Sequence, residues 1–390
     1  MSRPMSRREM LAVTTSAALT APFINRGRVR LSPMSQQSYS TRCVDLVRSS
    51  LVIDMLFPLT LSGETQERWG PGLDGFNESD AREFRESEID VAHVAVGVGG
   101  RSVDDAYRNV MTFVGTYNAI VANRPDVFMR IDSADDLDRV RGSARTGILI
   151  GIQNSHHFRN PDDVNTFHNL GQRVSQLTYN SRNMIGNGST ERIDGGISDF
   201  GAAIIQRMNE VGMAVDVSHC GDRTTLDAFE LSTKPVLITH SNARALAPGH
   251  PRCKPDDAIR AVARSGGVMG LTAVRMFVKN DEPTTIEHYL DHFDHVRDLI
   301  GPEHLGVGSD IDLHGYDDMP AEENERLRAG YKGSYGFREK IDVEGVDHPR
   351  RMFDLTEGLI RRGYADEQIR GILGGNFRRV LSEIWDSAGS

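Results

Sequence analysis

Short apolar runs recur along the chain from about residue 42 onward, and most are apolar at every position rather than at alternate ones. They cover residues 51–56, 91–99, 147–154, 173–179, 213–219, 235–241, 266–273 and 305–312. Strands of a parallel sheet that is covered on both faces have this pattern, because all of their side chains are buried. The pattern therefore predicts eight parallel strands.

Amphipathic stretches between these runs are typical of helices. In residues 198–212, Ser198 and Asp199 are capping candidates and Gly212 is a usual stop, and residues 285–301 form a second such stretch. Eight strands that alternate with helices predict an α/β fold of the (β/α)8 TIM-barrel type, in one domain over residues 42–390. A doubly wound sheet is the alternative, but it would normally use fewer strands.

Composition narrows the class of protein. A chain of 390 residues fits one barrel with insertions. The formal charge of -10 is spread along the sequence and no basic block appears, so nucleic acid is not an expected partner. No apolar stretch approaches the roughly 18 residues that span a bilayer. Three cysteines, Cys43, Cys220 and Cys253, do not make a disulfide framework.

The N-terminal residues 1–30 are expected to lie outside the fold. Arg7 and Arg8 precede a mildly apolar, almost uncharged stretch from Met10 to Ile24, which is the pattern of a twin-arginine export signal. A disordered tail is the alternative. The export interpretation predicts a periplasmic or otherwise extracytoplasmic protein.

Polar residues end several of the apolar runs, and these positions suggest chemistry. They are Asp54, Gln153, Tyr179, His219, His240 and Asp310. In a barrel of this type the active site lies at the carboxyl ends of the strands. Neutral imidazoles on consecutive strands are good zinc ligands, and an aspartate beside the metal can take a proton from bound water. The sequence thus predicts a metal site that includes His219 and His240.

The segment 313–351 is long, polar and rich in glycine and tyrosine. Because it follows the last strand, we expect it to cover the mouth of the barrel. Its tyrosines and the cations Lys332, Arg338 and Lys340 could close on an anionic substrate. A charge-rich surface loop is the alternative.

Five segments of the chain resemble the renal or membrane dipeptidases, a family of the amidohydrolase superfamily. They are residues 209–219, 234–246, 250–271, 306–312 and 373–381. The resemblance implies a (β/α)8 barrel that hydrolyses dipeptides with two zinc ions and a bridging glutamate. It also implies a homodimer.

By position in the resemblance, His219 and His240 match the two histidines of the second metal. Asp310 matches the acid that handles the proton of the attacking water. Arg252 matches a residue that binds the substrate carboxylate, which suits its planar fork of donors.

The chain departs from the family at four positions. Leu56 and Pro58 stand where the family has the His-x-Asp pair of the first metal, and neither can bind zinc. Gln153 stands at the bridging glutamate, and a neutral amide is a much poorer zinc ligand. Tyr179 replaces a substrate-binding histidine. We therefore expect the first metal to be absent, and the protein to hold one zinc ion or none.

The remaining candidates complete the predicted site. We assign Asp310, Tyr179 and His156 to catalysis, Arg252, Tyr179 and Asn183 to substrate binding, and His219, His240 and Gln153 to the metal. His157 is expected to be a hydrogen-bonding loop residue and Cys220 a packing residue.

Three functions follow as hypotheses. The first is an exported, one-zinc hydrolase that cuts an amide bond of a dipeptide-like or anionic small molecule. The second is a metal-independent isomerase, lyase or tailoring enzyme on the same barrel. The third is a non-catalytic binding protein.

Overall fold

The computed structural model describes residues 27–31, 37–97 and 99–385. The predicted export signal falls almost entirely outside these residues and stays a prediction. In the part of the chain that is described, no helix is both long enough and apolar enough to cross a membrane.

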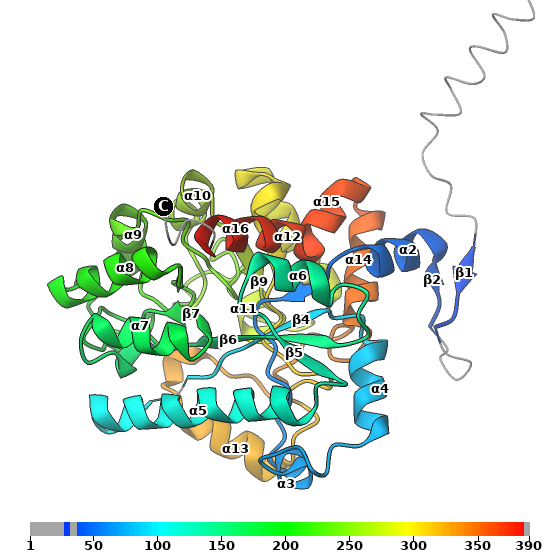
Figure 1. Cartoon of the computed structure of the whole chain (residues 1–390). Coiled ribbons are helices and arrows are strands. Elements are labelled where there is room, and N and C mark those ends of the chain that lie inside the picture. The colour runs from blue at the N-terminus through cyan, green and yellow to red at the C-terminus, as the bar shows by residue number, and fades with distance from the viewer. Residues whose placement is uncertain (1–26, 32–36, 98, 386–390) are drawn as a thin grey trace, which may run out of the picture.

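A curled parallel sheet forms the centre of the molecule (Figure 1). Its strands run in the order β8–β7–β6–β4–β3–β10–β9, and β5 lies beside β6. The bounds are β3 (Ile53–Asp54), β4 (Val91–Val94), β5 (Phe128–Arg130), β6 (Thr146–Ile152), β7 (Gln172–Gln176), β8 (Ala214–Asp216), β9 (Met269–Leu271) and β10 (Leu305–Val307). A separate antiparallel pair joins β1 (Arg28–Val29) to β2 (Tyr39–Ser40).

The predicted strand at 235–241 is reduced to two isolated bridges. Leu237 pairs in parallel with Asp216 of β8, and Ile238 pairs in parallel with Met269 of β9. The backbones are very close here, since a Cβ on Gly270 or Gly308 would lie 2.1 or 1.9 Å from the carbonyl oxygen of Thr239. The α/β prediction is confirmed as a curled parallel sheet compatible with a TIM-like barrel, but its ladders do not form a continuous closed ring.

Helices surround the sheet, and both predicted helices are present. The helix α8 (Asp199–Val211) begins after Ser198, whose side chain accepts a hydrogen bond from Gly201 N, and ends at Gly212 with φ of 78°. The second is α12 (Ile286–Ile300). The other helices are α2 (Thr41–Ser49), α3 (Gly63–Trp69), α4 (Glu78–Glu86), α5 (Val103–Asn123), α6 (Ala134–Val140), η1 (Ser155–His157), α7 (Asp162–Asn169), α9 (Asp222–Leu231), α10 (Asp256–Arg264), α11 (Arg275–Val278), η2 (Pro302–His304), α13 (Ala321–Ala329), η3 (Gly333–Tyr335), α14 (Arg351–Arg361), α15 (Asp366–Arg370), η4 (Gly371–Gly375) and α16 (Asn376–Trp385).

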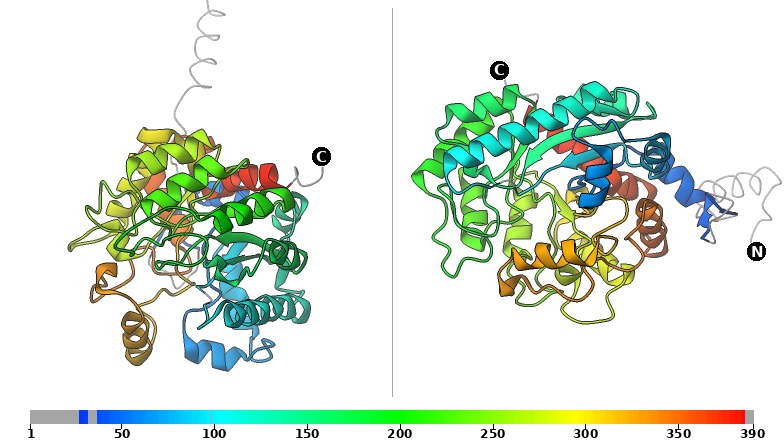
Figure 2. Two further views of the ribbon diagram at one scale, coloured as in Figure 1. Left: turned by 90° about the vertical axis from the view of Figure 1, so that its left-hand side faces the viewer. Right: turned by 90° about the horizontal axis from the view of Figure 1, so that it is seen from below.

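The two ends of the sheet are covered differently. At the amino ends of the strands, apolar side chains of α16 such as Phe377 and Ile384 pack against Ile53 and Leu149 in one buried cluster. At the other end lie α3, α13 and α5, which face the viewer in the right panel of Figure 2. Because α16 packs on the amino ends of the strands, a site is expected at their carboxyl ends.

Candidate active site

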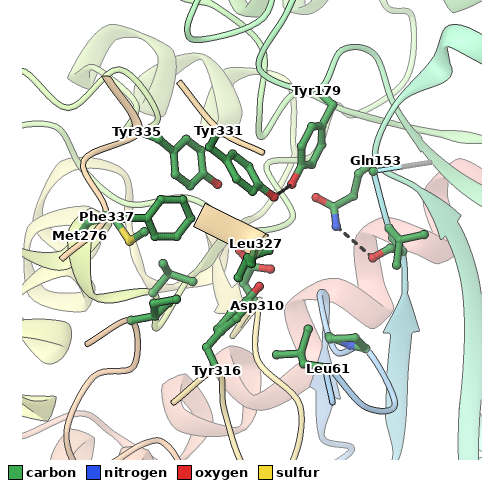
Figure 3. Close-up of a pocket in the computed structure, with 16 residues that line it drawn as sticks. Leu61, Gln153, Tyr179, Met276, Asp310, Tyr316, Leu327, Tyr331, Tyr335 and Phe337 are labelled. Atoms are coloured by element: carbon green, nitrogen blue, oxygen red, sulfur yellow. Dashed lines mark hydrogen bonds between the residues drawn. The ribbon is translucent and has the colours of Figure 1, made fainter. Parts of the chain in front are cut away.

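A cavity of about 180 Å³ lies at the carboxyl ends of the strands (Figure 3). It is lined by Pro58, Leu61, Ala95, Val96, Gly97, Gln153, Tyr179, Val274, Met276, Asp310, Tyr316, Leu327, Tyr331, Tyr335, Phe337 and Ile341. Three of the residues predicted for the site thus share one cavity: Gln153, Tyr179 and Asp310. The last six residues of the lining belong to the segment 313–351, whose contribution is aromatic and aliphatic.

Asp310 is held in place by hydrogen bonds between β10 and β3. Its backbone N–H donates to the carbonyl of Leu56 at 2.9 Å. The preceding residue, Ser309, donates from its N–H and its hydroxyl to the Asp54 carboxylate at 2.8 and 2.5 Å. These contacts keep Asp310 at φ of 62°, a conformation uncommon outside glycine, and such strain is frequent at functional positions.

The pKa of the Asp310 carboxyl lies close to neutral pH. Burial raises its pKa from an ordinary 3.8 to about 7, although the nearby Arg252 cation acts in the opposite direction. A group with a pKa near the working pH exchanges protons most effectively. Asp310 can therefore act as an acid or a base in this cavity.

Two tyrosine hydroxyls face Gln153 across the cavity. Tyr179 and Tyr331 are joined hydroxyl to hydroxyl at 2.6 Å, and Figure 3 shows Tyr335 in the same row. Burial raises the pKa of both Tyr179 and Tyr331, so both hydroxyls stay protonated. Gln153 donates its Nε2 to the carbonyl of Ala95 at 2.9 Å, which leaves its Oε1 on the cavity side. The tyrosine hydroxyls and Gln153 Oε1 together offer a hydrogen-bond donor and an acceptor to a bound molecule.

His219 and His240 lie together behind Tyr179. Their Nε2 atoms are 2.9 Å apart, and the Tyr179 ring stacks on the His219 ring with centroids 4.2 Å apart. Both are buried, at 1% and 0% exposure, and neither lines the cavity. Burial first, and then the Arg252 cation, holds the pKa of each imidazole well below its usual value.

The outer nitrogens of the two histidines are already engaged. His219 Nδ1 donates to Asn180 Oδ1 at 2.7 Å. His240 Nδ1 lies 2.8 Å from the Thr239 hydroxyl, which itself donates to Asp216. Metal-bound histidines have this kind of support. These hydrogen bonds to the two Nδ1 atoms are the feature of the site that favours a cation between the two Nε2 atoms.

The ligand set nevertheless falls short of a zinc site. A catalytic zinc takes three protein ligands, and the imidazole pair supplies two. Within the described residues, no three His, Cys, Asp or Glu side chains are grouped so that they could hold a metal ion. Leu56 and Pro58 supply no ligand atom, and Gln153 is a neutral amide. The residues present fit neither the two-zinc site that the resemblance implies nor a three-ligand single site.

Arg252 is committed to the backbone. Its Nη1 donates to the carbonyl of Ser218 at 2.6 Å and its Nη2 to the carbonyl of His240 at 2.8 Å. Only its Nε is without a partner among the described residues, and Arg252 does not line the cavity. Its structural effect is to hold the histidine-bearing ends together, and its predicted role toward the substrate carboxylate stays a prediction.

Asn183 and His156 also lie outside the lining of the cavity. Asn183 donates to Leu177 O and Asn154 Oδ1, and its own Oδ1 accepts from two backbone N–H groups. His156 lies in η1, which packs against α5, and burial lowers its pKa. Their predicted roles stay predictions.

Two of the three loop cations expected to meet an anionic substrate have protein partners, and the third, Lys340, does not line the cavity either. Lys332 lies 3.2 Å from Glu191, and Arg338 pairs with Glu282. Neither lines the cavity, whereas Tyr331 and Tyr335 of the same segment do.

Sequence reasoning missed two residues close to the histidine pair. Asn180 sits at φ of 57° and fixes the orientation of His219, and a local signal existed, since asparagine tolerates this conformation and directly follows Tyr179. His93 on β4 donates from Nδ1 to the carbonyl of Met55 at 2.6 Å, while its buried Nε2 has no partner in the described part of the chain. One histidine inside an apolar run gave no comparable signal.

Comparison with known proteins identifies the family. Residues 41–327 match the family model described as membrane dipeptidase, Peptidase family M19. The chain belongs to the membrane dipeptidase family. The resemblance found in the sequence is thereby confirmed.

Two curated relatives are fungal dipeptidases. Dipeptidase TcpJ of Claviceps purpurea is 31% identical over 261 residues, which cover 66% of this chain and 55% of the relative. Dipeptidase VerJ of Clonostachys rogersoniana is 28% identical over 283 residues, which cover 72% of this chain and 66% of the relative. The chain thus spans between about half and two thirds of these relatives.

Solved structures agree on the fold. An amidohydrolase from Pseudomonas aeruginosa is 28% identical with a TM-score of 0.74, over 88% of this chain and 99% of that one. The probable dipeptidase PvdM from Pseudomonas aeruginosa has a TM-score of 0.72 at 18% identity, over 88% of this chain and 98% of that one.

Proposed function

We propose that this protein hydrolyses an amide bond of a dipeptide or peptide-like small molecule, with Asp310 accepting the proton of the attacking water. The observation that carries the proposal is the Asp310 carboxyl in the cavity, whose pKa burial raises to about 7. Family membership supports hydrolysis as the reaction. General-base catalysis of this kind contributes about 10²- to 10⁴-fold to a rate.

The tyrosine pair supports the same assignment. Of two hydroxyls joined at 2.6 Å, one donates to the other and the second keeps its proton for a cavity ligand. A hydroxyl that faces the cavity can hydrogen-bond the oxygen on which charge develops when water attacks a carbonyl. Gln153 Oε1 is an acceptor for an N–H of the same molecule.

A one-zinc hydrolase is the second candidate. It is favoured by the facing Nε2 atoms of His219 and His240, and it was the expectation from sequence. We route no step through zinc, because the third protein ligand is missing from the described residues.

Product analysis and elemental analysis test both candidates. The purified protein is incubated with dipeptides and N-substituted dipeptides, and products are identified by mass spectrometry. Two products whose combined mass exceeds that of the substrate by one water, formed by the native protein but not by the Asp310→Asn variant, support the proposal. Isomers or elimination products would show a metal-independent non-hydrolytic enzyme. If no probe is turned over, the hypothesis of a non-catalytic binding protein is favoured.

Zinc content separates the two hydrolases. One zinc per active chain, lost together with activity in His219→Ala, would favour the second candidate. Activity in metal-free protein that chelators do not affect would favour the first.

Location and assembly are proposed on sequence grounds. Arg7, Arg8 and the apolar stretch behind them support export by the twin-arginine route. Replacement of both arginines by lysine should keep the protein in the cytoplasm. The homodimer implied by the family is tested by the solution mass.

A further inference from the structure

A second and larger cavity adjoins the one that holds Asp310. It has a volume of about 540 Å³, and Pro58 and Val96 line both cavities. Its walls come from residues 58–73, which include α3, and from one face of α5. The right panel of Figure 2 shows α3 and α5 at this same end of the molecule.

The wall supplied by α5 is a stripe along the helix. Phe113, Thr116, Tyr117 and Ile120 line the cavity, and the spacing of these four positions puts them on one helical face. Seven residues of rise correspond to a length of about 10 Å. The rings of Phe113 and Tyr117 are 4.7 Å apart, so the groove is elongated and has an aromatic wall.

The opposite wall is also mainly apolar. Leu59, Trp69 and Leu73 contribute to it, and among the described residues of the lining only Glu67 is charged. Pro58 and Val96, which line both cavities, have no polar side chain. Pro58 stands where the family resemblance implies a metal ligand, so the replacement that removes a ligand also provides an apolar surface between the cavities.

We propose that this groove holds a linear acyl chain carried by the substrate, whose dipeptide-like part occupies the Asp310 cavity. This rests on the function proposed above. The groove is three times as large as the Asp310 cavity. One amino-acid side chain leaves most of that volume unfilled, whereas a chain laid along α5 contacts the whole stripe.

A chain-length series tests the proposal. The probes are alanyl-alanine carrying N-acetyl, N-butanoyl, N-hexanoyl, N-octanoyl or N-decanoyl groups, titrated calorimetrically into the full-length protein. Mass spectrometry counts intact probe afterwards, and KM replaces Kd for any probe that is turned over. We expect affinity to rise up to about fourfold per buried methylene and to level off once the groove is full.

Two matched variants of α5 locate the effect. Thr116 lines the groove and its hydroxyl donates to the Thr112 carbonyl at 2.9 Å, whereas Thr112 is exposed, donates to the Arg108 carbonyl at 3.1 Å and does not line it. Thr116→Trp fills the groove and should abolish the dependence on chain length. Thr112→Trp makes the same change one turn away and should preserve it.

The outcomes separate this proposal from the function it rests on. Affinity that is independent of chain length, or a dependence that survives in Thr116→Trp, overturns the acyl-chain site even if the dipeptides are hydrolysed. A chain-length dependence that only Thr116→Trp removes supports the site even if no probe is turned over.

Discussion

Replacing Asp310 with asparagine should abolish activity and at the same time stabilise the fold at alkaline pH. The pKa of this carboxyl is raised on folding from 3.8 to about 7, mainly by burial. At about 1.36 kcal/mol per pKa unit, ionising it costs the native state about 4 kcal/mol more than it costs the unfolded chain. Solvent that reaches the carboxylate through the cavity screens part of this cost, so we expect a gain of about 2 kcal/mol at pH 8.

The sign and the pH window follow from linkage. A group whose pKa is raised on folding contributes stability that is fully present below pH 3.8 and is lost as the pH rises to about 7. The advantage of Asp310→Asn should therefore be small at pH 4, grow toward pH 7 and stay constant above it. Asparagine tolerates the positive φ of 62° as well as aspartate does, so the backbone adds no new strain.

Urea unfolding followed by circular dichroism at a series of pH values measures the effect. Asp312 provides the control, since its carboxylate accepts hydrogen bonds from the N–H groups of Leu61, His314 and Gly315. Asp312→Asn places an N–H donor where an acceptor is needed, and should cost about 1–3 kcal/mol. An Asp310→Asn variant that is less stable than the native protein at pH 8 would refute the reasoning, because the ionised carboxylate would then be stabilised by a partner.

Two further variants test the groups around the cavity. Tyr331→Phe removes the 2.6 Å hydrogen bond with Tyr179. Turnover should fall at least tenfold, while the free energy of unfolding measured with urea should change by only about 1 kcal/mol. Unchanged kinetics would show that the tyrosine pair takes no part in the reaction. Asn180→Ala removes the partner of His219 Nδ1 and puts alanine at φ of 57°, so we expect the free energy of unfolding to fall by about 2 kcal/mol. Asn180→Gly should recover the part of this loss that is due to backbone strain. Equal losses in the two variants would show that strain contributes nothing.

Most of the sheet could be predicted from the chain, because strands buried on both faces leave continuous apolar runs. Seven of the eight predicted runs contain a strand of the sheet, and the eighth, at 235–241, makes only the two bridges described above. The strand β5 (Phe128–Arg130) was missed because its apolar run extends only from Val127 to Met129 before the exposed Arg130 interrupts it. A run that short carries too little periodicity to separate it from a loop.

In the site, residues at strand ends could be predicted from the sequence, whereas those of the segment 313–351 could not. Asp310, Tyr179 and Gln153 were predicted because they stand at or near the carboxyl ends of apolar runs, and the ends of parallel strands converge by topology alone. Tyr331 reaches the cavity from the segment 313–351, and only tertiary structure decides which of its polar and aromatic residues turn inward. Lys332 was a reasonable candidate from charge, but its neighbour Glu191 comes from a loop distant in sequence, and no local pattern shows that pairing.

The replaced metal positions and two buried cations nearby are consistent with each other in electrostatic terms. By resemblance, Pro58 and Gln153 stand where the family has carboxylates, so two negative charges are missing. Lys254 is buried against the carbonyls of Val217 and Cys220 at 2.7 and 2.9 Å, and burial lowers its pKa to about 8. Arg252 is buried beside it, and both cations donate to carbonyl and hydroxyl oxygens rather than to carboxylates in the described part of the chain. A doubly charged metal ion would join two unpaired buried cations, which is unfavourable at short range in a poorly solvated site. Arg252 also acts on the Asp310 carboxyl without lining the cavity, and its positive charge favours a negatively charged or strongly polarised oxygen there. Such an oxygen is what Asp310 and the tyrosine pair need from a substrate.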